Sequence, residues 1–282
     1  MSTASRLTQR MAELRERGRK ALIPYITAGD PHPDHTVALM RALVAGGADA
    51  IELGMPFSDP MADGPTIQLA CERALKAGTT LRQILEIVRR FREVDAATPL
   101  VLMGYLNPIE RFGRDAFADA AQQAGVDGVL IVDLAVEEAE HYLPAFRDRG
   151  MDPIFLLSPT TPATRIRHIA EHASGYLYYV SLKGVTGAAT LDIASVTARL
   201  AEIRAETALP VAVGFGIRDA ASAAAVGAVA DGVIVGSALV SLIERHAADP
   251  ASLPARLQST LADMRAALDA LTSADATAVS SA

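Results

Sequence analysis

The sequence predicts a single α/β domain folded as a (β/α)8 barrel, a TIM barrel, with an extra helix at its amino-terminal end. Short apolar runs recur along the chain, helical patterns separate them, and the runs are apolar almost throughout. Such strands are typical of a parallel sheet covered by helices on both faces. An open doubly wound sheet would usually carry a glycine-rich turn after its first strand. That position reads ITAGDPHPD, without the G-x-G-x-x-G pattern.

Residues 1–270 are expected to form this one catalytic barrel domain. Its first element is an amphipathic helix with Leu7, Met11 and Leu14 on one side. Strands are expected at 21–27, 48–53, 99–105, 127–133, 152–158, 176–181, 210–215 and 231–236. Helices are expected at 34–46, 80–94, 114–124, 136–149, 162–173, 192–207 and 218–229. The segment 271–282 loses apolar periodicity, which predicts a disordered tail.

Composition and charge exclude several classes of protein. Half of the residues are hydrophobic, which supplies ample material for a core, and the formal net charge is −7. A negative balance argues against a general attraction to nucleic acid or anionic membrane. The single cysteine, Cys71, excludes an intramolecular disulfide, and the amino terminus lacks an apolar secretory run. We therefore expect a cytoplasmic protein without a membrane span.

Glycines after the last three expected strands point to a phosphate site. The segments are KGVTGAAT (183–190), GFGIRDA (214–220) and GSALV (236–240). Glycine lets the backbone approach a ligand, and free N–H groups at a helix N-terminus favour an anion. Barrels often bind phosphate with the loops after strands seven and eight. We expect Gly216, Gly236 and Ser237 to bind a phosphorylated metabolite, with Gly187 closing from the third loop. Simple tight turns are the alternative.

Glu52 ends the second expected strand and shares a face with Ala50, whereas Ile51 and Leu53 take the other face. A small residue such as Ala50 suits a crowded interior, so Glu52 is expected to point inward at the barrel mouth. No basic residue occurs between positions 42 and 72. A buried carboxyl without a partner is costly, which predicts a raised pKa and a role in proton transfer. The alternative is an ion pair with a distant arginine.

The loop GMPFSDPMADGP after this strand is long for its place, and its prolines indicate a shaped segment. Asp63 could lie over the strand ends and accept a hydrogen bond from a substrate. Asp59, in SDP, is better explained as a turn former. Aromatic and apolar side chains that could line a pocket for a flat ligand occur at other strand ends. They are Tyr25, Met103, Tyr105, Tyr178 and Phe215.

Two other kinds of catalytic group are weaker candidates. Lys183 lies just past the sixth strand, where a Schiff-base aldolase of a sugar phosphate could place its nucleophile. Its glycine-bearing loop favours a solvated amine instead. The histidines form no convincing metal set, because His168 and His172 fit an exposed helix face and His32 and His35 lack a further ligand. We predict no catalytic metal.

Five motifs together resemble one known family. The segment IELGMPFSDPMADGPTIQ (51–68) closely resembles the signature of the tryptophan synthase alpha subunit family. The similarity continues in order with PYITAGDP, YYVSLKGVTG, VGFGI and VGSALV, and it runs from about residue 7 to residue 265. Two positions depart from the family pattern: Tyr25 stands where a phenylalanine is usual, and Ala135 in DLAVEE stands where a proline is usual.

The resemblance implies a lyase of tryptophan biosynthesis that reversibly cleaves indole-3-glycerol phosphate to indole and glyceraldehyde 3-phosphate. It implies neither a metal nor a Schiff base, and no cofactor on this chain. It assigns Glu52 and Asp63 as the essential acids and Tyr178 as the tyrosine at the end of strand six. Thr186 corresponds to the threonine of a mobile loop, and the phosphate positions match those proposed above. The implied partner is a beta subunit with pyridoxal phosphate, in an assembly of two alpha and two beta chains, which Asp59 could contact.

Overall fold

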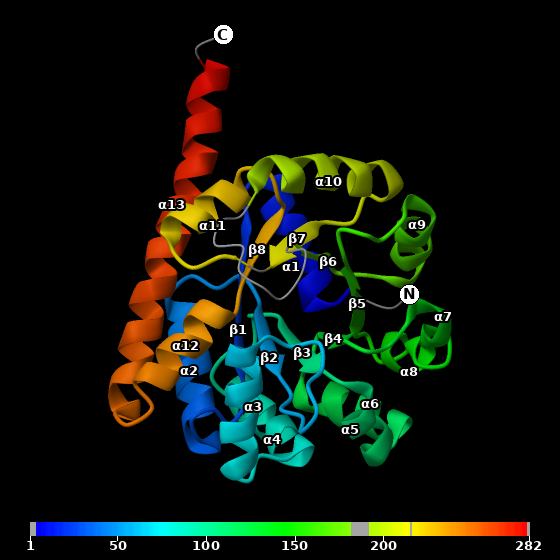
Figure 1. Cartoon of the computed structure of the whole chain (residues 1–282), viewed down its shortest axis with the longest axis vertical. Coiled ribbons are helices and arrows are strands. Elements are labelled where there is room, and N and C mark those ends of the chain that lie inside the picture. The colour runs from blue at the N-terminus through cyan, green and yellow to red at the C-terminus, as the bar shows by residue number, and fades with distance from the viewer. Residues whose placement is uncertain (1–3, 182–191, 215, 281–282) are drawn as a thin grey trace.

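Eight parallel strands close into a barrel in strict sequence order in the computed structural model, which confirms the predicted fold (Figure 1). Residues 4–181, 192–214 and 216–280 are described, with side chains up to residue 271. The strands are β1 (Ala21–Thr27), β2 (Ile51–Gly54), β3 (Leu100–Gly104), β4 (Gly128–Ile131), β5 (Asp152–Leu157), β6 (Leu177–Val180), β7 (Val211–Gly214) and β8 (Gly232–Val235). Each lies within or beside the run that predicted it.

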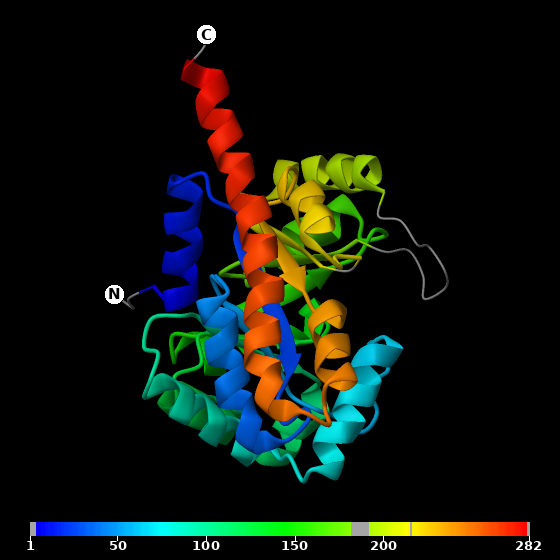
Figure 2. The ribbon, with the colours of Figure 1, turned by 90° about the vertical axis from the view of Figure 1, so that its left-hand side faces the viewer.

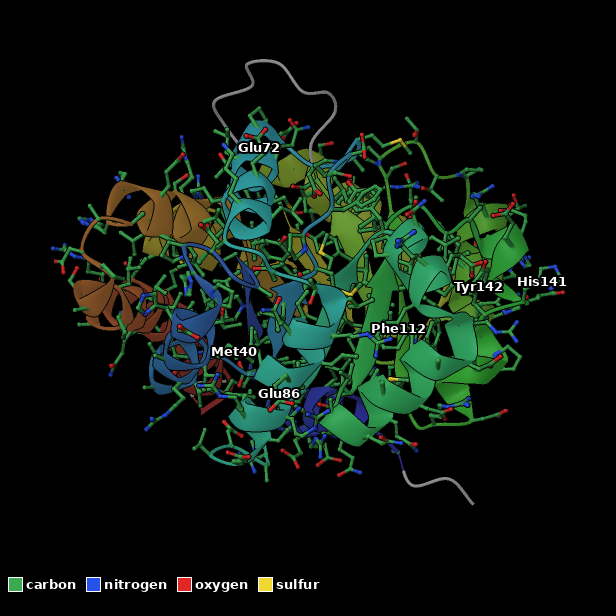
Figure 3. All side chains as sticks on the ribbon, turned by 90° about the horizontal axis from the view of Figure 1, so that it is seen from below. Met40, Glu72, Glu86, Phe112, His141 and Tyr142 are labelled. Carbon is green, nitrogen blue, oxygen red and sulfur yellow. The ribbon has the colours of Figure 1, made fainter. Side chains whose placement is uncertain are left out.

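Helices cover the outside of the barrel. The described ones are α1 (Arg6–Glu16), α2 (Pro33–Ala45), α3 (Pro65–Lys76), α4 (Leu81–Arg92), α5 (Leu106–Phe112), α6 (Arg114–Ala124), α7 (Val136–Ala139), α8 (Leu143–Arg147), α9 (Ala163–His172), α10 (Ile193–Glu206), α11 (Ala220–Gly227), α12 (Ser237–Arg245) and α13 (Leu253–Ser280), with a 3₁₀ turn at Pro250–Ser252. Figure 3 shows part of this layer, with Met40 on α2, Glu86 on α4 and Phe112 on α5.

The helices differ from the sequence prediction in several places. The expected helix 136–149 is divided into α7 and α8, because Pro144 lies in the first turn of α8 and cannot donate a backbone hydrogen bond to a preceding turn. Helices α3, α5, α12 and the first part of α13 lie outside the ranges expected for helices. The segment 271–282 was expected to be a disordered tail, whereas α13 continues through Ser280 and passes beyond the barrel (Figure 2). Its many alanines have the highest intrinsic helix propensity.

Alternation along the strands creates two separate apolar layers. Ile51, Leu53 and their equivalents on the other strands pack outward against the helices. Ala50, Val101, Leu130 and their equivalents fill the barrel interior. A closed parallel barrel therefore buries both faces of each strand, which explains why the runs are apolar without alternation.

Helix α1 closes the amino-terminal end of this interior. Its buried side chains Leu7, Met11 and Leu14 join the interior cluster, as the predicted amphipathic pattern requires. Asp152 at the start of β5 holds the helix by accepting hydrogen bonds from Ser5 and from Thr8, the latter at 2.9 Å. The amino-terminal end of a barrel supports stability rather than chemistry, so α1 acts as a plug that excludes water.

Aspartates also tie neighbouring strands together at this end. Asp49, Asp127 and Asp231 each precede a strand and accept a backbone N–H from the first or second residue of a neighbouring strand. The N–O distances are 2.9 Å to Leu22, 2.8 Å to Leu100 and 2.9 Å to Val211. Arginines neutralise these carboxylates, as in the 2.6 Å contact of Arg92 with Asp127. These acids are structural, which separates them from the acids at the other end of the barrel.

Leu7→Ala should remove a fully buried side chain from the plug without removing a polar contact. We expect unfolding free energy to fall by about 2–5 kcal/mol, because the rigid barrel floor cannot collapse into the cavity. Urea unfolding followed by circular dichroism measures this change. Glu16→Ala, at an exposed position of the same helix, should change stability by less than about 0.5 kcal/mol. Equal effects of the two substitutions would show that α1 does not seal the interior.

Candidate active site

Glu52 is fully buried on the inner face of β2, as the alternation with Ala50 predicted. In the sheet it lies between Tyr25 of β1 and Val101 of β3. No described basic side chain forms an ion pair with it within 4.0 Å, so the alternative of a distant arginine partner is not supported. Glu52 is thus an acid enclosed by the apolar and aromatic interior of the barrel.

One tyrosine that sequence reasoning missed binds this carboxyl group. The hydroxyl of Tyr176 donates to Oε1 of Glu52, while Oε2 is buried and has no hydrogen-bond partner among the described residues. Burial raises the pKa of Glu52 to about 8, although the Tyr176 hydrogen bond acts in the opposite direction. Tyr176 and Tyr178 alternate along the same strand and share its inner face. That spacing was the signal from which Tyr176 could have been found.

Asp63 lies in the loop between β2 and α3 and is held by two neighbours. The hydroxyl of Tyr105 donates to Asp63 Oδ2 at 3.0 Å and accepts from the backbone N–H of Ala62 at 3.0 Å. Gln68 on α3 donates to the Asp63 carbonyl oxygen at 2.9 Å. Burial raises the pKa of Asp63, and the Tyr105 hydrogen bond partly offsets that effect. The loop is therefore shaped by specific contacts, and Tyr105 orients the carboxylate of Asp63.

Asp59 differs from Asp63 in its surroundings. Its side chain is exposed and accepts a hydrogen bond from Ser58 at 2.5 Å, while its carbonyl oxygen accepts from the Met61 N–H at 2.9 Å. Both contacts are local and typical of a turn. The two acids of the loop are thus separated as the sequence predicted.

Tyr25 and Tyr178 lie near both Glu52 and Asp63. Burial raises the pKa of each hydroxyl well above its usual range, and the charges of Glu52 and Asp63 raise it further. A Cβ at Gly54 would overlap the Tyr25 hydroxyl, and one at Gly214 would overlap that of Tyr178. These strand-end glycines let the rings fold across the barrel mouth. The acids on β2 and on its loop therefore face a shared aromatic space.

The described phosphate candidates lie at adjacent strand ends. β7 pairs with β8, and Gly216 and Gly236 follow these two strands. Gly216 has φ +78°, a left-handed conformation that favours glycine. Gly236 precedes α12 and Ser237 begins it, and no described side chain caps the helix, so its first turn could bind an anion through backbone N–H groups. Lys183, Thr186, Gly187 and Phe215 lie outside the described residues.

Neither a metal cluster nor a nearby cavity offers a competing site. Among the described side chains, no three His, Cys, Asp or Glu residues gather as metal ligands would. A cavity of about 620 Å³ lies at the opposite, amino-terminal end, bordered by α1 and the segment before β7. Its basic groups already bind protein acceptors, such as Lys20 with Ala230 O at 3.0 Å and Arg15 with Ala208 O at 3.2 Å. None of the described helices is long and apolar enough to span a membrane.

Known proteins share this fold and this sequence over almost the full chain. The family model described as tryptophan synthase alpha chain matches residues 11–269. The tryptophan synthase alpha chain of Marinobacter nauticus is 63% identical over 267 residues, which cover 95% of this chain and 99% of the relative. That of Thioalkalivibrio sulfidiphilus is 61% identical over 265 residues, which cover 94% of this chain and 100% of the relative.

Solved structures agree. The tryptophan synthase subunit alpha of Legionella pneumophila superposes with a TM-score of 0.87 at 46% identity, over 95% of this chain and 99% of that one. A chain of tryptophan synthase from Mycobacterium tuberculosis, in an aminoacrylate-bound form, gives 0.83 at 37% identity, over 94% and 100%.

The chain belongs to the tryptophan synthase alpha chain family. It is accordingly a carbon–carbon lyase of tryptophan biosynthesis, and its reaction is the reversible retro-aldol cleavage of indole-3-glycerol phosphate to indole and glyceraldehyde 3-phosphate. Nothing in the comparisons favours a Schiff-base aldolase that uses Lys183. Asp63 lies in the loop that follows the carboxyl end of β2, the end at which barrel chemistry occurs, and Glu52 lies within β2 below that loop.

The raised pKa of Glu52 predicts a pH-dependent cost to the fold. The pKa of Glu52 rises from 4.5 to about 8 on folding. As pH increases, the unfolded chain therefore releases this proton at a lower pH than the folded chain does. Its contribution to stability is intact below pH 4.5 and falls by ~1.4 kcal/mol per pH unit until pH reaches the folded value. Glu52→Gln should therefore be more stable than wild type at pH 7.5 by a margin that shrinks toward pH 5.5. Urea unfolding at both pH values measures the margin.

Glu16→Gln, an exposed change on α1, serves as the control and should show no such pH dependence. A Glu52→Gln margin that is equal at both pH values would contradict the raised pKa.

Proposed function

We propose that Glu52 carries out both proton transfers of the cleavage. The observation that supports this role is its buried carboxyl group, with one oxygen bound by Tyr176 and the other without a partner among the described residues. With a pKa of about 8 the group is mostly protonated at neutral pH. It would donate its proton to indole C3, and the resulting carboxylate would then remove the proton of the side-chain hydroxyl as the carbon–carbon bond breaks. The acid is regenerated in each cycle.

Asp63 is proposed to stabilise the charge that this first transfer creates. Protonation at C3 makes the indole ring a cation whose N–H is a strong donor. A carboxylate facing that N–H binds most strongly in the transition state, where the charge develops. Tyr105 fixes one oxygen of Asp63 at 3.0 Å and leaves the other for the substrate. Tyr25, Met103, Tyr178 and Phe215 are proposed to line the space for the ring.

The phosphate group is proposed to bind at the N-terminus of α12. Gly236 and Ser237 supply backbone N–H groups, Gly216 lies at the neighbouring strand end, and Gly187 and Thr186 are assigned from the sequence resemblance. A phosphate held far from the reacting carbon orients the substrate, so its binding energy assists the chemical step.

We propose a beta subunit as the partner, in an assembly of two alpha and two beta chains, with pyridoxal phosphate on the beta subunit. The active-site loop presents an apolar side chain to solvent, since Met61 is 82% exposed, and Leu69 on the adjoining helix α3 is 45% exposed. Such exposed apolar groups, next to the exposed Asp59, are typical of a protein interface. A cytoplasmic location is consistent with a biosynthetic enzyme whose single cysteine forms no disulfide.

Release of indole from indole-3-glycerol phosphate, with and without a beta subunit, tests the proposal directly. Glu52→Gln should lower kcat by at least about 10²-fold while the substrate still binds, because the amide keeps the shape but cannot transfer a proton.

Wild-type kcat/KM should decline above a pH of about 8, where Glu52 loses its proton. Near-normal turnover by Glu52→Gln would contradict the assignment of Glu52 as the proton-transfer group. A covalent adduct trapped by borohydride at Lys183 would favour the aldolase alternative.

Tyr105→Phe removes the hydroxyl that binds Asp63 but keeps the ring, whose centroid lies 5.3 Å from that of Phe57. The pKa of Asp63 should rise further because its hydrogen bond is lost. We expect kcat/KM to fall roughly tenfold, as for loss of one orienting hydrogen bond, and to recover in part as pH increases. A pH–rate profile of the variant measures both effects. A decrease that is uniform across pH would indicate a pocket defect instead.

A further inference from the structure

Three charged side chains from separate parts of the barrel meet beside the site. Arg73, in the last turn of α3, binds both oxygens of Asp30, with Nε–Oδ1 at 2.8 Å and NH2–Oδ2 at 2.9 Å. Its remaining nitrogen, NH1, binds Glu244 Oε1 at 2.9 Å. Asp30 is fully buried in the loop after β1, and Glu244 lies near the end of α12. The guanidinium therefore joins two helices and a loop, in a fork geometry that lysine cannot reproduce.

The two helices that Arg73 joins carry opposite ends of the proposed substrate site. Helix α3 begins two residues after Asp63, and its Gln68 binds the Asp63 carbonyl oxygen. Helix α12 begins at Ser237, in the proposed phosphate turn. The helices lie side by side in two perpendicular views (Figures 1 and 2). Their separation therefore helps to set the span between the acid for the indole ring and the backbone donors for the phosphate.

The same two helices also pack on Tyr25. Ala70 of α3 and Val240 of α12 form a small buried cluster with this ring. Gly236 approaches the ring as well, since a Cβ there would lie 3.7 Å from it. Apolar packing brings the helices together but is not directional. The salt bridges of Arg73 have a defined geometry, so they add the directional constraint that apolar packing lacks.

We propose that Arg73, Asp30 and Glu244 form a positioning clamp that fixes α3 against α12 and so sets the distance between the two binding ends of the substrate. This inference rests on the proposed roles of Asp63 and the α12 N-terminus. The clamp residues do not touch the reacting atoms. They act through the helices that carry the groups that do.

The two halves of the clamp differ in burial, which allows positioning to be separated from folding. Removing Arg73 would leave Asp30 as a buried, unpaired carboxylate. A substitution of Arg73 would therefore destabilise the fold and could not isolate a positioning role. Glu244 is 42% exposed at its side chain, and an exposed ion pair adds little to stability. Glu244→Ala should break the link between α3 and α12 and leave the Arg73–Asp30 bond in place.

The experiment compares Glu244→Ala with wild type in the full chain. We expect kcat/KM for indole release to fall between about 10- and 100-fold, mainly through kcat, since misplacement by about an ångström has effects of this size. The dissociation constants of indole alone and of glyceraldehyde 3-phosphate alone should stay within about twofold of wild type, because each end remains intact. Glu244→Gln keeps an acceptor oxygen for Arg73 and should restore most of the activity.

Arg245→Ala is the matched control, since among the described residues the side chain of that neighbour on α12 donates to Ser241 O of its own helix, at 3.2 Å. It should keep wild-type kcat/KM, and circular dichroism and melting temperature should be unchanged in all three variants. Wild-type kcat/KM in Glu244→Ala, or an equal loss of fragment binding, would overturn the clamp while leaving the proposed function intact. A wild-type chain that releases no indole would overturn the proposed function itself.

Discussion

The burial of the Glu52 carboxyl group is the constraint on which the rest of the site depends. A carboxyl group in water would be ionised at neutral pH and could not donate a proton to carbon. Inside the barrel, desolvation penalises the charged form and raises the pKa to about 8. That effect requires an interior closed to water, which the eight strands provide at the sides and helix α1 provides at the floor. In the proposed mechanism, the fold therefore contributes to the chemistry by maintaining a low dielectric around one acid.

Asp63 lies in a different environment from Glu52, and this difference suits the two carboxyl groups to different proposed roles. Asp63 belongs to a loop and accepts a hydrogen bond from Tyr105, which opposes the rise in its pKa that burial causes. A carboxylate that stays ionised suits the stabilisation of a cation, whereas a protonated carboxyl group suits proton donation. Tyr25 and Tyr178 lie within electrostatic reach of both. Two carboxyl groups facing one aromatic space can thus serve two roles without exchanging them.

The outer helices add precision to this arrangement. A strand fixes Glu52 directly, whereas Asp63 is held by Tyr105 and α3, and the proposed phosphate turn is held by α12. Their relative position depends on packing around Tyr25 and on the bonds of Arg73 with Asp30 and Glu244. Because the substrate is proposed to bind at both ends, the spacing of the two helices affects how accurately its reacting bond is placed against Glu52. Under the proposed clamp, residues that do not touch the substrate contribute to the geometry of the site.

The sequence by itself determined the barrel, the order of its strands and the inward direction of Glu52. Those features follow from local periodicity, because alternation assigns each strand residue to one face and apolar runs mark burial on both. Motif similarity added the residues of the loops. Only the tertiary structure decided that Tyr176 binds Glu52, that Tyr105 orients Asp63 and that Arg73 joins α3 to α12. Each of these contacts joins residues 42 to 171 positions apart in the chain, and no local pattern specifies which side chains barrel closure brings together.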